Sequence, residues 1–220
     1  MSKPILVSYD GTSNDDDALA LARLLAAGGA PLALAYVRHS REFDPRREEL
    51  AEHDARRRLA QGATWLGDDS LPQHVVIHPS TWVGLAELAG QLGAAMIVFG
   101  SDYRTAPGNV SPGTSAQHLL EGGTVAVAVA PAGIRIGGPP AVTKVAVDGD
   151  PVATATAQAI AAELGATVVA DPDPAAELIV VGSRPDGPAG KITHSGAAHA
   201  RLGSARAAVL VAPTGAPLSP

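Results

Sequence analysis

The stretch "VFGSDYRTAPGNVSPGTSAQHLL", residues 98–120, decides the fold. It begins as an apolar strand, passes through a loop rich in Gly, Pro, Ser and Thr, and ends in a helical pattern. Gly100 ends the strand, and Gly113, Thr114 and Ser115 open the helix. Units of this kind place backbone amides and hydroxyl groups where phosphates are often bound. The stretch therefore predicts an α/β protein with a candidate phosphate-binding loop.

Apolar runs alternate with helical patterns on both sides of this stretch. The expected strands are residues 5–9, 31–37, 73–78, 94–101 and 124–131, and the expected helices are 14–29, 44–67, 80–93 and 113–121. Strands that alternate with helices imply a parallel sheet covered on both faces. We therefore expect residues 1–132 to form one doubly wound domain with an open, five-stranded parallel sheet.

The pattern restarts after a Gly/Pro-rich linker at residues 133–141. Residues 143–165 echo the first strand and helix, residues 176–183 echo 94–101, and residues 207–213 echo 125–131. Asp10 precedes Gly100 by 90 positions, whereas Asp148 precedes Gly182 by 34, so the second copy lacks 56 residues. We expect residues 141–213 to form a truncated repeat without the third strand.

The deletion leaves the path of residues 171–177 open. These seven residues would join two parallel strands, a connection that usually needs a dozen residues or more. Either the link is extended, or residues 166–170 form a short or irregular strand.

Composition narrows the function classes. The chain is 46% hydrophobic and 17% charged, carries a net charge of −6, and has no basic stretch interleaved with aromatic residues, which argues against a nucleic-acid partner. It contains no Cys, so thiol chemistry and disulfides are excluded. The longest Ala/Leu-rich run, residues 18–37, is interrupted by Arg, Gly and Pro and makes a poor membrane span. These features predict a soluble, cytoplasmic protein with no membrane partner.

Two clusters of charged residues are explained by helix structure and do not require a binding role. Asp15, Asp16 and Asp17 stand at the start of a helix, where negative charge is favoured. Residues 44–67 carry five arginines that alternate with acids, which predicts a solvated helix face; these are Arg46, Arg47, Arg56, Arg57 and Arg58.

The elements together resemble the universal stress protein (UspA-like) family, in its tandem form with a truncated second repeat. Four stretches carry the resemblance: "ILVSYDGTS", "AAMIVFGS", "PGTSAQHLL" and "VAVAVAP". It covers the whole first copy and the two ends of the second. It implies the strand order 3-2-1-4-5 and an intrachain pseudo-dimer, in which residues 125–129 and 209–212 pair as antiparallel strands. A further homodimer is left open.

Nucleotide-binding members of the family carry a loop of the form G-x2-G-x9-G-[ST]. Gly100 and Gly113 match the first and third glycines, whereas Tyr103 replaces the middle one. The resemblance implies that ATP or a related adenine nucleotide, with or without Mg²⁺, is bound by Asp10, Gly11, Val37, Gly100, Ser101, Arg104, Gly113, Thr114 and Ser115. In this arrangement Arg104 supplies the cation and the backbone near Val37 meets the adenine.

Simpler explanations exist for the same residues. Asp10-Gly11 is a common turn, and Thr114 and Ser115 are ordinary helix-capping residue types. An aromatic residue at position 103 costs energy if the position needs a positive φ, and prolines in the loop remove amide donors. In the second copy, Pro185 and Ser195 replace two of the three glycines, so a structural role is expected there.

Two functions therefore remain open. The first is a nucleotide-binding sensor or regulator with at most slow ATP hydrolysis. The second is an interaction module whose phosphate loop has degenerated. No G-x-S-x-G sequence or histidine metal pattern occurs, so we assign neither catalytic nor metal-binding residues.

Overall fold

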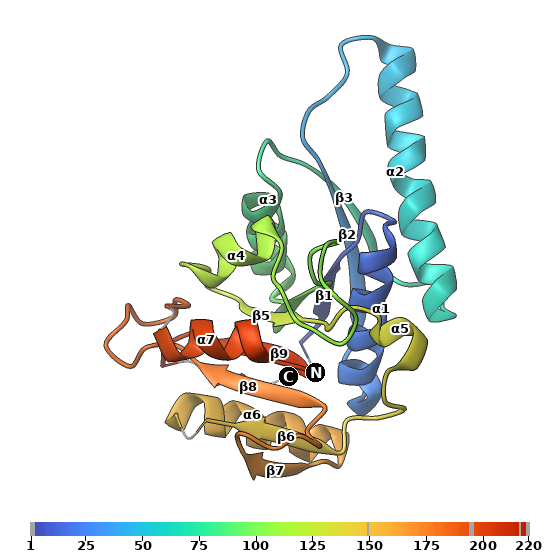
Figure 1. Ribbon diagram of the computed structural model, residues 1–220. Helices are drawn as coiled ribbons and strands as arrows, with labels where there is room; N and C mark the ends of the chain where they lie inside the picture. The colour runs from blue at the N-terminus through green and yellow to red at the C-terminus, as the bar shows by residue number, and fades with distance from the viewer. Residues whose placement is uncertain (1–2, 149, 194–195, 216, 219–220) are drawn as a thin grey trace.

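The protein is built around one twisted sheet of nine strands, with helices on both faces (Figure 1). In the computed structural model, the described residues are 3–148, 150–193, 196–215 and 217–218. The first half contains β1 (Ile5–Ser8), α1 (Ser13–Leu25), η1 (Ala26–Gly28), β2 (Leu32–Arg38), α2 (Pro45–Leu66), β3 (Gln73–Ile77), α3 (Thr81–Leu92), β4 (Met96–Phe99), α4 (Thr114–Leu120) and β5 (Ala126–Val129). The second half contains α5 (Ile134–Gly137), β6 (Lys144–Val147), α6 (Pro151–Leu164), β7 (Thr167–Ala170), β8 (Leu178–Gly182), α7 (Gly196–Ser204) and β9 (Ala208–Ala212).

The strand order confirms both predicted sheets. It runs β3-β2-β1-β4-β5-β9-β8-β6-β7, so the first five strands follow the order 3-2-1-4-5 and pair in parallel. The second half repeats this order from β9 to β7 and contains no counterpart of β3 among the described residues. Every pair within it is parallel.

The two half-sheets join through β5 and β9, which pair as antiparallel strands as predicted. Val127 pairs with Val211, Ala128 with Leu210, and Val129 with Val209. The equivalent position of each β5 residue in the second copy lies 82 residues later in the sequence. Only Ala128 pairs with its own equivalent, Leu210, and the other pairs are arranged symmetrically about it. The junction is therefore a local twofold contact between two equivalent strands.

Hydrogen bonds after β4 and β8 repeat at the same offset of 82 residues. The Ser101 hydroxyl donates to the Ala130 carbonyl at 2.6 Å, and the Ser183 hydroxyl donates to the Ala212 carbonyl at 2.6 Å. Each hydroxyl also accepts a backbone amide ten residues further on, at 3.1 and 3.2 Å. The two loops thus share one backbone framework.

Residues 171–177 cross the sheet without a helix, and β7 is a regular parallel strand beside β6. The link passes on the face covered by α7: Asp171 forms an ion pair with Arg201 of α7 at 2.5 Å, and Ala176 packs in the same cluster as Leu202. Lys144 contacts Asp173 at 3.4 Å. Side-chain contacts therefore hold in place a short link that contains one turn, at the point where the first half has α2, β3 and α3.

The linker between the halves contains a short helix, α5, that the sequence pattern did not predict. Asp17 of α1, only 2% exposed, accepts hydrogen bonds from the backbone amides of Gly133 and Arg135 at 2.8 and 3.0 Å. It also pairs with the Arg135 guanidinium at 2.8 Å. A buried carboxylate that satisfies two free amides explains why this Gly-rich segment is helical and docked.

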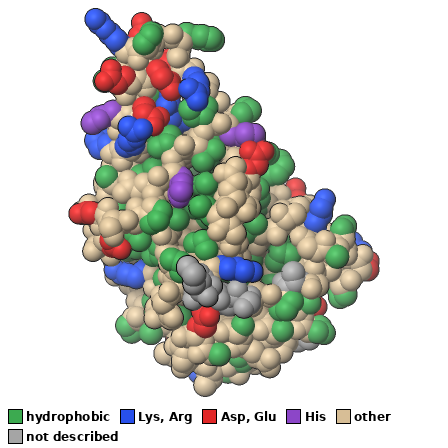
Figure 2. All heavy atoms as spheres, turned by 180° about the vertical axis from the view of Figure 1, so that it is seen from behind, with side chains coloured by type: hydrophobic (Ala, Val, Ile, Leu, Met, Phe, Trp, Pro, Cys, Tyr) green, Lys and Arg blue, Asp and Glu red, His purple; other side chains and the backbone are tan. Residues whose placement is uncertain are grey.

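Two apolar layers cover the sheet. One contains α1, α2 and α6, and the other contains α3, α4 and α7. The N-terminal end of α2 projects beyond the sheet, and side chains of both charges cover that end (Figures 1 and 2). No helix in the described part of the chain is long and apolar enough to cross a membrane.

Candidate functional site

A cleft of about 400 Å³ opens at the carboxyl ends of β1 and β4, between the first turns of α1, α3 and α4. In an open parallel sheet, ligands bind at this edge where the strand order reverses. The walls are formed by Ser8, Asp10, Thr12, Asn14, Asp15, Thr81, Phe99, Gly100, Ser101, Asp102, Tyr103, Gly113, Thr114, Ser115 and Ala116.

Six of the nine residues expected to bind a nucleotide line this cleft, namely Asp10, Gly100, Ser101, Gly113, Thr114 and Ser115. Three do not. Gly11 has a φ of 88°, and a β-carbon added to it would contact the Arg58 side chain. Val37 is buried in the apolar layer that contains α3 and α4. Arg104 lines a neighbouring cleft.

Gly100 is required by packing. A β-carbon on Gly100 would overlap the backbone carbonyl oxygen of Asn14 at the start of α1. The Asn14 amide also donates to the Ser101 carbonyl at 3.1 Å. The glycine therefore lets α1 approach the end of β4, which is a different reason from the close approach of a ligand.

The helix end of the loop is open to the cleft. Gly113 is the N-cap of α4, with φ of −71°, and a β-carbon there would meet nothing within 4 Å. Because a glycine fills the N-cap position, Thr114 and Ser115 do not cap α4 with their side chains. The Ser101 hydroxyl, in contrast, is buried and engaged by Ala130 and Ser111.

A contact between Tyr103 and Arg104 explains why Arg104 does not supply a cation to this cleft. The Arg104 guanidinium carbon lies 4.9 Å from the centre of the Tyr103 ring, and its Nε donates to the Tyr103 hydroxyl at 2.7 Å. This stack holds Arg104 out of the nucleotide cleft. No described non-glycine residue has a positive φ, so Tyr103 is accommodated without the backbone strain that the sequence raised as a concern.

The acids at the start of α1 were expected only to interact with the helix dipole. Each of them also accepts a hydrogen bond from a residue outside α1. Asp15 accepts the Asp10 backbone amide at 2.5 Å, and Asp16 accepts the Tyr9 hydroxyl at 3.3 Å. Burial, followed by the hydrogen bond with the Asp10 side chain and the charge of Asp10, raises the pKa of Asp15 to about 8, against the opposing effect of the hydrogen bond from the Asp10 backbone amide. Asp15 is therefore protonated near neutral pH and shares the cleft with an acidic neighbour.

Arg58, which the sequence pattern placed on a solvated helix face, contacts a residue of the cleft although it does not line the cleft itself. Its guanidinium donates to the Asp10 carbonyl at 2.8 Å and lies 5.7 Å from the centre of the Tyr36 ring. Arg58 therefore bridges the loop after β1 and the end of β2, which is where the adenine was expected. Its contact with Asp10 joins residues 48 positions apart, which no local pattern could reveal.

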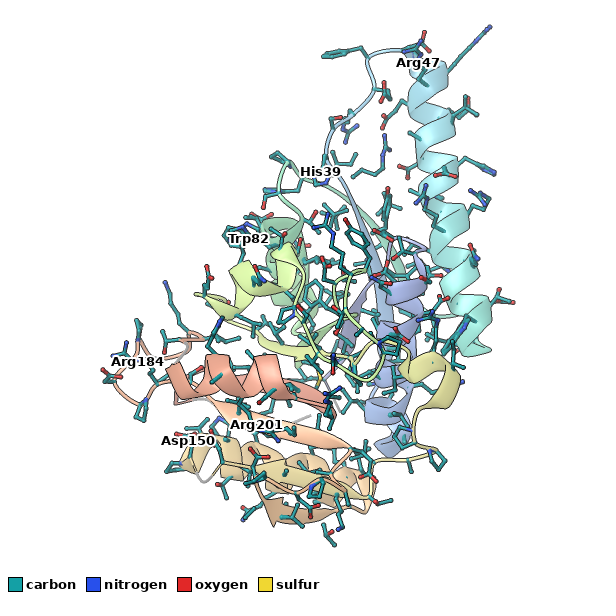
Figure 3. The ribbon with its side chains drawn as sticks, viewed as in Figure 1. His39, Arg47, Trp82, Asp150, Arg184 and Arg201 are labelled. Carbon is teal, nitrogen blue, oxygen red and sulfur yellow. The ribbon has the colours of Figure 1, made fainter. Side chains whose placement is uncertain are left out.

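The corresponding loop of the second half can be compared with the first only in part, because one of its three key positions lies outside the described residues. Gly182 keeps its place, and a β-carbon there would overlap the carboxylate of Asp150, the N-cap of α6 (Figure 3). Ser195 lies outside the described residues. Within the described ranges, no group of three or more His, Asp and Glu side chains is placed to hold a metal ion.

Fold and cleft define a doubly wound α/β protein with a candidate ligand site at the carboxyl edge of its sheet. The sequence model of the universal stress protein family matches residues 1–131, more than half of the chain. The chain therefore belongs to the universal stress protein family. The match ends before the second half.

Solved structures resemble nearly the whole chain. A universal stress protein from Archaeoglobus fulgidus DSM 4304 is 15% identical, with a TM-score of 0.61, and the alignment covers 98% of this chain and 100% of that one. A functionally unknown protein from Pseudomonas aeruginosa PAO1 is 18% identical, with a TM-score of 0.63 and coverage of 96% and 93%. At these identities the likeness shows the fold alone.

A further universal stress protein from Archaeoglobus fulgidus was solved in complex with dAMP. It is 15% identical, covers 43% of this chain and 78% of its own, and has a TM-score of 0.36, which is too low to support an argument about this site. The comparison with curated proteins gave no match.

Proposed function

We propose that the cleft at the ends of β1 and β4 binds an adenine nucleotide, and that the protein acts as a sensor or regulator. One observation carries the proposal: Asp10, two residues after β1, and both ends of the phosphate loop, Gly100 and Gly113, line a single cleft of about 400 Å³. The hydroxyls of Thr114 and Ser115 line it as well. A cleft of this size lies within the usual range for small-molecule sites.

The charge of the cleft favours a nucleotide that arrives with its own cation. Of the described residues that line it, none is Lys, Arg or His, whereas Asp10, Asp15 and Asp102 are acidic residues, of which Asp15 is protonated near neutral pH. A triphosphate would therefore need Mg²⁺ for neutralisation, as in other phosphate sites that use the metal as a clamp. We expect ATP to bind with Mg²⁺ and much more weakly without it.

The second half has a structural role in this proposal. Its strand order and hydrogen bonds match those of the first half, but the stretch corresponding to α2, β3 and α3 is absent. We propose that it is a truncated second repeat, spanning residues 141–213, that covers the edge of β5. The first repeat, residues 1–132, then carries the ligand site alone.

Substitution of Gly113 tests the site. Gly113→Val should weaken ATP binding roughly tenfold or more, because its side chain would occupy the space in front of the α4 amides. Gly90→Val is the matched control, since Gly90 is exposed on α3 and a β-carbon there also meets nothing. Calorimetric titration with ATP, with and without Mg²⁺, measures both.

Tyr103→Gly separates this proposal from the alternative function. If the cleft binds nucleotide, Tyr103→Gly should preserve or tighten binding, because it restores the loop glycine and releases Arg104 from the stack. If neither the natural protein nor Tyr103→Gly binds, the protein is better described as an interaction module. Binding that survives Gly113→Val unchanged would place the ligand elsewhere.

A further inference from the structure

A second cleft of about 380 Å³ lies beside the nucleotide cleft, between the loop after β4 and the end of α7. Its walls come from both halves of the chain, so it exists only because β5 and β9 hold the halves together. It is lined by Asp102, Arg104, Thr105, Ala106, Asn109, Val110, Ser111, Gly203, Ser204 and Arg206. Of its polar and charged walls, Asp102, Ser111 and Arg206 also line neighbouring clefts, whereas Arg104, Thr105, Asn109 and Ser204 do not.

Two arginines from different halves converge on this cleft. Arg104 comes from the loop after β4, and Arg206 comes from the turn between α7 and β9. Neither forms an ion pair with a carboxylate among the described residues: Arg104 contacts the Tyr103 hydroxyl, and Arg206 contacts the amide oxygen of Asn109. Two guanidinium groups held by neutral partners leave positive charge available in an acidic protein.

The remaining walls suit an oxyanion. The Thr105 hydroxyl is buried in the described structure without a hydrogen-bond partner, and Ser111 and Ser204 also line the cleft. Asp102 is the one carboxylate in the wall, and its Oδ1 already accepts the Arg104 backbone amide at 2.9 Å. Two arginines against one engaged carboxylate leave a net positive cleft.

The corresponding part of the second half lacks this charge. At the offset of 82, Arg184 and Asp186 replace Asp102 and Arg104, and they form a two-point ion pair at 3.0 and 2.5 Å. Position 124, which corresponds to Arg206, is Thr. The unpaired arginines are therefore specific to one side of the molecule and are not a by-product of the repeated framework.

We propose that this cleft is an anion site that binds a phosphate group between Arg104 and Arg206. Guanidinium groups donate in a planar fork that matches phosphate oxygens, and two of them offset the charge of a phosphate dianion. A rotation of the Thr105 side chain lets its hydroxyl donate to the same group. The phosphate is either a free ion or part of a small phosphorylated metabolite.

Titration with inorganic phosphate at constant ionic strength tests the site. The side-chain Nε–Hε resonances of Arg104 and Arg206 should shift together and saturate by about 10 mM phosphate. Those of Arg46 and Arg47, which are exposed on α2, serve as the internal control and should not follow. No saturable shift at Arg104 and Arg206, or an equal shift at Arg46, overturns the proposal.

Variants separate binding from folding. Arg104→Gln and Arg206→Gln should each weaken phosphate binding roughly tenfold or more, whereas Arg46→Gln should not. Arg206→Lys retains the charge but not the fork, so it should bind phosphate at intermediate strength. Normal binding by both Gln variants, with unchanged thermal melting, contradicts the proposal.

The Gly113→Val variant distinguishes the source of the phosphate and keeps this inference independent of the nucleotide proposal. Inorganic phosphate should shift both arginines equally well in this variant. If AMP also shifts them, and loses that effect in Gly113→Val, the phosphate comes from a nucleotide held in the first cleft. If AMP acts alike in both proteins, the second cleft binds phosphorylated metabolites by itself.

Discussion

Asp15 lies at the wall of the nucleotide cleft next to Asp10, and two carboxyl groups occupy one small volume. The pKa of Asp15 is raised to about 8, first by burial and then by the hydrogen bond with the Asp10 side chain and the charge of Asp10. In the unfolded chain the same group has its ordinary pKa near 3.8. Folding therefore holds a proton on Asp15 through the neutral pH range.

This proton links stability to pH with a definite sign. As pH rises from about 4 to about 8, the unfolded state has lost the proton while the folded state keeps it, so the free energy of unfolding falls. Asp15→Asn imitates the protonated acid and should remove this fall. Urea denaturation at a series of pH values measures the difference between the two proteins.

Asp68→Asn is the control with the opposite sign. Hydrogen bonds from Ser70 lower the pKa of Asp68, so its contribution is present at neutral pH and lost as pH falls. Identical pH profiles for the natural protein and Asp15→Asn would show that Asp15 is not protonated in the folded state.

The link between β7 and β8 shows how an element is replaced. Seven residues span a crossover that helices make in the first half, and the ion pair between Asp171 and Arg201 anchors the start of the link to α7. The Asp171 side chain is 8% exposed and the Arg201 side chain 25% exposed. A buried pair of this kind substitutes for the packing that a helix would provide.

Removal of Arg201 should therefore cost stability. Arg201→Ala leaves the Asp171 carboxylate buried without its partner, and we expect a loss of about 1–3 kcal/mol in the free energy of unfolding. Arg184→Ala breaks an ion pair whose side chains are 51% and 68% exposed, so it should cost much less stability, because water screens the pair. Chemical denaturation compares the two, and equal losses would contradict the anchoring role.

At the scale of the whole molecule, the second half covers an edge that would otherwise be exposed. The residues of β5 and β9 at the junction are completely or almost completely buried, and the register is symmetric. Because each strand pairs with its own counterpart, β5 carries the geometry needed to pair with a second copy of itself.

A chain ending at residue 140 should therefore form a dimer through β5, provided that residues 1–140 fold. In the symmetric register, Ala128 would lie opposite Ala128 of the second copy. Sedimentation at several concentrations measures the association, with the full chain as the reference. A folded fragment that stays monomeric at every concentration would contradict this view of the junction.

Much of the fold follows from local patterns. The strands and the missing third strand of the second half were predicted from apolar periodicity and from the spacing of matching motifs, which act over a few residues, whereas the pairing of β5 with β9 was implied by the family resemblance. The helix α5 was not predicted, because its stability depends on Asp17, more than a hundred residues earlier in the chain.

The candidate site divides in the same way. Sequence alone determined that Asp10, Gly100 and the Gly113 helix start meet at one edge, because the carboxyl ends of parallel strands share an edge. Only the tertiary structure decided that Arg104 lines the second cleft together with Arg206, and that Arg58 reaches Asp10. The direction of a long side chain depends on the partners it meets in space, and those partners leave no signal in the neighbouring sequence.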